Sequence, residues 1–297
     1  MTATRGHGRP GVRTLAARIR EMLDAVTAQV DEVVARHHPT PESLHELHRS
    51  MRRLRHALGF WARLLQPGDR SILKPLDRRL ARLSRLVGRV RDRDVMLALL
   101  EGGSLPAPKP ADAPLVARLR ARWRDDARTG RELIRVFLRS ERDAHLFEQL
   151  AATLTLPPRS GAPKSLPDLL EEEAEERRDR IRAAHRRARR KASAARFHRL
   201  RIQVRRMRHL GELRSELDPE HPAQPPPVVR RLQSQLGRLH DLDIVLDGIG
   251  SGLAKSDWGE ALRRERRRLR RSIETTLHQP RWPWRPSSLP GPRGPPS

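Results

Sequence analysis

Residues 44–61 read LHELHRSMRRLRHALGFW, and residues 197–213 read FHRLRIQVRRMRHLGEL. An offset of 153 residues aligns the two segments, which places His45 on His198 and His56 on His209. The adjacent arginines Arg52 and Arg53 fall on a second arginine pair in the later segment. Two copies of one pattern in a chain of 297 residues indicate an internal duplication.

Each copy carries an apolar stripe and a cationic stripe at helical spacing. At about 100° per residue, the apolar side chains at positions 44, 47, 51, 54 and 58 share one face of a helix. A second face, roughly 110° away, carries the cationic stripe. In the first copy this stripe comprises His45, His48, Arg52 and Arg55, and in the second His198, Arg201, Arg205 and Arg208. Packing requires only the apolar stripe, so the repeated cations indicate a binding surface.

The composition predicts a polyanionic partner. The formal net charge is +26, with 62 basic against 36 acidic residues, and only five of the basic residues are lysines. An arginine-rich genome would account for part of this bias, but the net charge is far larger than solubility requires. Arginine suits phosphate because its planar guanidinium donates two parallel hydrogen bonds to two oxygens. We therefore expect phosphate groups in the ligand.

Several classes of protein are excluded or disfavoured by the sequence. The chain has no cysteine, which excludes disulfides, zinc–thiolate sites and thiol nucleophiles. No apolar run approaches the roughly 20 residues that a membrane-spanning helix needs. The N-terminal residues are basic but no apolar segment follows, which argues against a secretory signal. We expect a soluble, cytoplasmic protein without a membrane partner.

The periodicity predicts an all-α protein made of two tandem helical bundles, with about four helices in each. We expect a flexible arm at 1–11, a first half at 12–154, a linker at 155–167, a second half at 168–278 and a disordered proline-rich tail at 279–297. Thr40 or Ser43 is the expected N-cap of the first basic helix. The expected helices are 12–36, 43–66, 72–100, 115–154 (one helix with a possible break at Gly130, or two helices), 169–195, 196–217, 228–249 and 257–278.

A second element also occurs twice, as LVGRVRDRDVML at 86–97 and QLGRLHDLDIVL at 235–246. Asp94 and Asp243 fall inside its apolar stripe, where a carboxylate is costly unless a cation meets it. We expect structural ion pairs there, with Arg55 and Arg208 as the partners. The aligned glycines, Gly88 and Gly237, are expected to allow close helix contact. Arg91 aligns with His240, and we expect both to line the binding site. Asp92 and Asp241 point to another face, and we expect ordinary ion-pair or solvent positions for them.

The two repeated elements together resemble the CHAD family, the conserved-histidine α-helical domain. The motifs that carry the resemblance are H-x-L-H/R-x(3)-R-R-x-R and LG-R-x-R/H-D-x-D, each present in both halves. The resemblance implies two helical subdomains related by pseudo-twofold symmetry around a basic central channel. It also implies binding of inorganic polyphosphate and association with polyphosphate granules. Residues matched by position to the family's are His45, Arg52, Arg53, Arg55, His198, Arg201, Arg205, Arg206 and Arg208. His48 departs from the pattern, which has arginine there.

Two alternative functions stay open. Non-sequence-specific nucleic-acid binding fits the charge and is expected at low salt, but the chain has no tyrosine and few other aromatic residues for base stacking. A metal-dependent phosphohydrolase is suggested by His45-Glu46-Leu47-His48, yet the spacing is H-E-x-H and not the H-E-x-x-H of zinc proteases. We favour a non-catalytic protein without cofactor or metal. Because a nearby anion favours protonated histidine, we expect tighter binding at mildly acidic pH.

Overall fold

The computed structural model describes residues 12–158, 166–217 and 227–278. The described residues form ten α-helices and no β-sheet, so the all-α prediction is confirmed. The arm predicted at 1–11 and the tail at 279–297 lie outside the described residues. The helices are α1 (Val12–Ala35), α2 (Pro41–Leu64), α3 (Pro67–Glu101), α4 (Ala113–Asp143), α5 (Leu146–Thr153), α6 (Leu166–Arg190), α7 (Ala194–Leu217), α8 (Pro227–Gly248), α9 (Gly250–Ala254) and α10 (Asp257–Leu277).

The helix ends follow local chemistry. Thr40 caps α2 by accepting a hydrogen bond from the backbone N–H of Ser43, and proline occupies the first helical position. The range 115–154 forms two helices, as one of the two alternatives predicted, but the break does not fall at Gly130, which lies inside α4. The chain instead turns at His145, whose φ of 52° is left-handed and ends the helical path between α4 and α5. The short helix α9 was not predicted.

The predicted apolar stripes form the core. In α2 the residues at positions 44, 47, 51, 54 and 58 are at most 1% exposed, and in α7 Phe197, Leu200 and Val204 are equally buried. The largest hydrophobic cluster joins α1–α6 with Leu210 and Leu213 of α7. Another cluster joins Trp123 of α4 with helices α8–α10. The two halves of the chain therefore share buried surface, which fixes α2 relative to α7.

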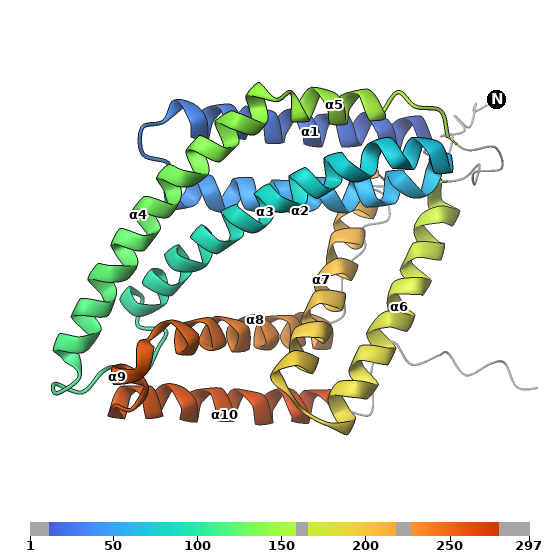
Figure 1. Ribbon diagram of the computed structural model, residues 1–297. Coiled ribbons are helices and arrows are strands. Elements are labelled where there is room, and N and C mark those ends of the chain that lie inside the picture. Colours follow the sequence, from blue (N-terminus) through green and yellow to red (C-terminus); the bar gives the residue numbers. More distant parts are fainter. Residues whose placement is uncertain (1–11, 159–165, 218–226, 279–297) are drawn as a thin grey trace, which may run out of the picture.

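Neighbouring helices pair in the same order in both halves. α1 packs on α2 and α6 on α7, while α3 packs on α4 and α8 on α10. In Figure 1, α6 and α7 run side by side at one edge of the molecule, and α8 and α10 lie together at the bottom. Direct contacts between α2 and α7 and between α3 and α8 join the halves. This places the two copies of each repeated element next to each other.

The aspartates of the second element are half-buried and form ion pairs, but the predicted partners are wrong. Asp94 pairs with Arg131 of α4 at 2.5 Å, and Asp243 pairs with Arg266 of α10 at 2.5 Å. Each pair ties an element of the repeat to the helix that packs beside it. The repeated pattern gave no indication of these partners, because Arg131 and Arg266 lie on helices outside the repeated segments.

The aligned glycines differ in their surroundings. A Cβ atom at Gly88 would lie 2.6 Å from Cε1 of His48, so this position requires glycine for the close approach of α3 to α2. At Gly237 nothing lies within 4 Å of such an atom, so the expectation of close contact there is wrong. Of the two aligned glycines, only Gly88 is in a position where packing restricts the size of the side chain.

This difference predicts opposite effects of one substitution. Gly88→Ala should lower the free energy of unfolding by about 1–3 kcal/mol, because the His48 ring must move in a packed site. Gly237→Ala should raise it by up to about 1 kcal/mol, because alanine is the better helix former and has room. Chemical denaturation of both variants measures the two values. Equal effects of the two substitutions would contradict this packing difference.

Candidate functional site

The two copies of the basic segment meet at a cleft of about 600 Å³ between α2, the start of α3, α6 and α7. Its lining combines cations from both copies with side chains of the helix that precedes the second copy. The lining residues are Arg52, Arg55, His56, Gly59, Phe60, Arg63, Asp77, Glu173, Glu176, Arg177, Arg180, Ile202, Arg205, Arg206 and His209. Arginine is the commonest residue of this lining, with seven arginines against three carboxylates.

Contacts across the cleft join the copies directly. An Nη2 hydrogen of Arg52 points to Nε2 of His209 at 3.1 Å, and the Nδ1 atom of the same ring lies 2.9 Å from a Glu212 carboxylate oxygen. If Nε2 accepts from the guanidinium, Nδ1 carries the proton that is donated to Glu212. The rings of His56 and His209, which are aligned residues of the repeat, stand 6.0 Å apart between centroids.

The arginines at the centre of the site are crowded by like charges. Burial lowers the pKa of Arg52 to about 10, with further lowering by Arg208 and Arg201. Burial also lowers the pKa of Arg205 to about 9, and Arg52 is the next largest cause. Both guanidinium groups stay protonated at neutral pH. Their mutual repulsion is a cost that an anion in the cleft would remove.

The histidines of the site are neutral at pH 7. Burial, followed by the charge of Arg52, lowers the pKa of His48 to about 3, and burial with Arg177 lowers that of His56 to about 3. The pKa of His240 falls to about 4, again chiefly through burial. The pKa values of His45 and His198 are also lowered, first by burial and next by Arg91 and Arg201, respectively.

The second repeated element extends this cationic surface. Arg91 of α3 donates through Nε to Nδ1 of His45 at 3.4 Å, and the rings of His198 and His240 lie 5.7 Å apart. Asp92 and Asp241 are half-buried, and burial raises the pKa of each despite the nearby cations Arg91 and Arg201. Asp92 forms an ion pair with Arg91 at 3.5 Å, which confirms the ion-pair alternative for this residue.

Some predicted site residues are held by carboxylates. Arg53 forms an ion pair with Glu216, which also binds Arg18 of α1 at 2.9 Å. Arg55 pairs with Asp77 of α3 at 3.2 Å and Arg208 with Glu212 at 3.2 Å. Arg53 is outside the lining of the cleft, whereas Arg55 and Arg206 are in it. The central unneutralised pair is Arg52 with Arg205, for which no ion pair within the described residues is found.

Sequence reasoning missed the contribution of α6. Arg177 and Arg180 line the cleft from this helix, and Arg63 at the end of α2 reaches Glu173 and Glu176. These residues belong to no repeated motif, so nothing in the pattern selected them from a basic run. The aligned histidines His56 and His209 did carry a signal, because both copies of the repeat contain them.

Neither a metal cluster nor a membrane segment is found in the described part of the chain. Within residues 12–158, 166–217 and 227–278, no three histidine or acidic side chains gather as they would around a metal ion. Over the same residues no helix has both the length and the apolar character that crossing a bilayer requires.

Comparisons with known proteins find the same architecture in other chains. The CHAD domain model matches residues 17–250, which is most of the chain. The crystal structure of the CHAD domain from the plant Ricinus communis aligns with a TM-score of 0.63 and 22% identity, covering 93% of this chain and 95% of that one.

PptA from Streptomyces chartreusis aligns with a TM-score of 0.59 and 16% identity, over 90% of this chain and 96% of its own. No curated protein sequence matches. At these identities the two structures establish a similar fold, while the domain model covers both repeated elements. The chain therefore belongs to the CHAD family.

Proposed function

We propose that this protein binds inorganic polyphosphate in the basic cleft and does so without cleaving it. The observation that carries the proposal is the meeting of Arg52 and Arg205, aligned residues of the repeat, at one electropositive hollow. A linear polymer that presents identical anions along its length suits a site built twice from the same cations. We further propose that the halves are arranged with pseudo-twofold symmetry around this channel, and that the protein associates with polyphosphate granules in the cytoplasm.

The chemistry of the residues supports binding by ion pairs and bidentate hydrogen bonds. Arg52 and Arg205 stay charged at neutral pH, and each guanidinium can grip two phosphate oxygens. The carboxylates Asp77, Glu173 and Glu176 hold the neighbouring arginines in position at the wall of the cleft. The clustered cations oppose a metal ion at His45 and His48, so we infer a binding protein. Release of phosphate from polyphosphate in the presence of Mg²⁺, Mn²⁺ or Zn²⁺ would contradict that inference.

The double substitution Arg52→Gln with Arg205→Gln should weaken polyphosphate binding at least about 100-fold. Each hydrogen bond to a charged group contributes about 1.5–3 kcal/mol, and about 1.4 kcal/mol corresponds to tenfold in affinity. Calorimetric titration at fixed salt measures the loss. The thermal midpoint should not fall, because the substitutions relieve repulsion between like charges.

A matched control removes the same charge elsewhere. Arg118→Gln with Arg139→Gln takes two exposed arginines from α4, and neither residue lines the cleft. This variant should lose less than about threefold in affinity at physiological salt, where distant charges are screened. Equal losses for the two double variants would show that net charge, and not the cleft, determines binding.

The lowered histidine pKa values set the direction of the pH dependence. A bound polyanion raises the pKa of each histidine, so the complex takes up protons that the free protein does not hold. Affinity should therefore be flat above about pH 7 and rise as the pH falls below about 6.5, the ordinary histidine pKa. His45 and His198 are exposed and contribute before the more buried His48 and His56.

Titrations between about pH 5.5 and 8 at constant salt test this dependence. The variant His45→Asn with His198→Asn should show a smaller rise, whereas His145→Asn, at an exposed position remote in sequence from both repeats, should keep the full rise. A flat affinity in the unmodified protein would remove the histidines from the binding mechanism.

A further inference from the structure

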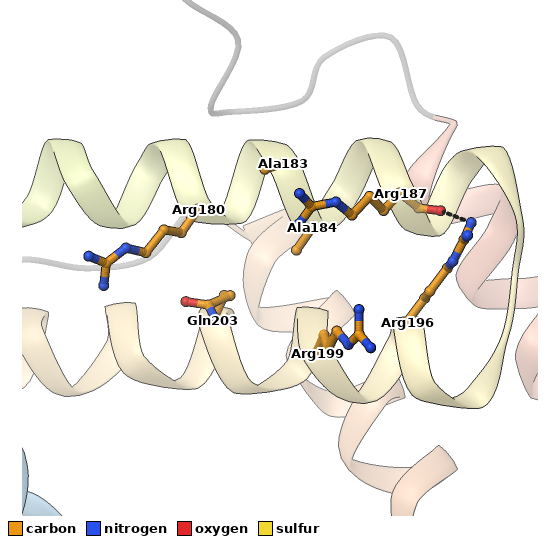
Figure 2. A pocket seen from close by; sticks show the side chains of 7 residues that line it. All are labelled: Arg180, Ala183, Ala184, Arg187, Arg196, Arg199 and Gln203. Carbon is orange, nitrogen blue, oxygen red and sulfur yellow. Dashed lines mark hydrogen bonds between the residues drawn. The ribbon is translucent and has the colours of Figure 1, made fainter.

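A second cavity, of about 330 Å³, lies in the groove between α6 and α7, outside the repeated cationic stripe. Figure 2 shows α6 above and α7 below, with side chains from both helices over the groove. The lining residues are Arg180, Ala183, Ala184, Arg187, Arg196, Arg199 and Gln203. Four of these are arginines and none is acidic, a lining that favours an anion of the phosphate class.

Two of the four arginines have guanidinium groups for which neither a carboxylate nor a carbonyl partner is found within the described residues. Arg196 donates to the backbone carbonyls of Arg187 and Lys191 at 2.8 and 3.2 Å, the first of which is the dashed line in Figure 2. Arg180 pairs with Glu176 at 3.1 Å. The side chains of Arg187 and Arg199 are exposed and make no ion pair with the described residues. These two cations are available to a ligand.

The groove and the basic cleft share one lining residue. Arg180 lines both cavities. On α7, positions 196, 199, 203 and 206 recur every three or four residues and therefore lie on one face, with the first three in the groove and the last in the cleft. From Arg196 to His209 this path measures about 20 Å, at 1.5 Å per residue. Ala183 and Ala184 contribute only small side chains to the lining of the groove.

We propose that the α6–α7 groove binds a second section of the same linear polyphosphate that occupies the cleft, with Arg187 and Arg199 as its phosphate ligands. This proposal rests on the proposed function. It gives the protein a physical basis for preferring long chains: a short oligophosphate fills the cleft alone, whereas a longer one also reaches the groove. Packing does not explain the unneutralised arginines, because neither side chain is buried.

The test compares inorganic triphosphate with long-chain polyphosphate on three double variants of the full chain. Arg187→Gln with Arg199→Gln should weaken long-chain binding by about tenfold or more and leave triphosphate binding unchanged. Because each lost phosphate contact reduces the salt dependence, the slope of log K against log salt for the long chain should fall by about two. Thermal unfolding verifies that each variant is folded.

The two remaining variants separate the possible failures. Arg52→Gln with Arg205→Gln should weaken both ligands, and Arg118→Gln with Arg139→Gln should affect neither by more than about threefold. If the groove variant matches the α4 control with the long chain, the groove is not part of the path, although the cleft proposal stands. If the cleft variant binds both ligands normally, the proposed function itself fails.

Discussion

Repulsion between like charges is the constraint on which this site depends. Core packing keeps Arg52 close to Arg205, because the apolar faces of α2 and α7 are both buried. Separating the two cations would expose leucines of these faces. Burial of apolar side chains contributes on the order of 1.5–3 kcal/mol for each residue, which offsets the electrostatic cost. The packing of the core therefore holds these two cations side by side at the wall of the cleft.

Carboxylates divide the arginines into two groups. Those that link helices are neutralised, as in the contacts of Arg53 with Glu216 and of Arg63 with Glu173, and they hold the crossing geometry. Four arginines that line the cavities have no such partner within the described residues: Arg52 and Arg205 at the cleft, and Arg187 and Arg199 at the groove. The electrostatic cost of these four cations therefore falls on the walls of the two cavities, where an anion would reduce it.

Periodicity predicted the parts of the fold that repeat. The stripes of α2 and α7 predicted which leucines are buried, and the alignment of the copies predicted that Arg52 and Arg205 have equivalent roles. Partners on helices outside the repeat could not be predicted from it. Arg131 and Arg266, which form ion pairs with Asp94 and Asp243, belong to no shared motif. The same holds for Arg177 and Arg180, because a basic helix has cations on every face and only packing determines which of them line a cavity.

Competition between polyphosphate and single-stranded nucleic acid at physiological salt is the most direct test of the central claim. Both competitors are polyanions, but Phe60 is the only Phe, Trp or Tyr side chain in the lining of the cleft, which therefore offers little surface for base stacking. Polyphosphate should displace a labelled oligonucleotide at equal phosphate concentration. Displacement of bound polyphosphate by the oligonucleotide would contradict this account and favour nucleic acid as the ligand.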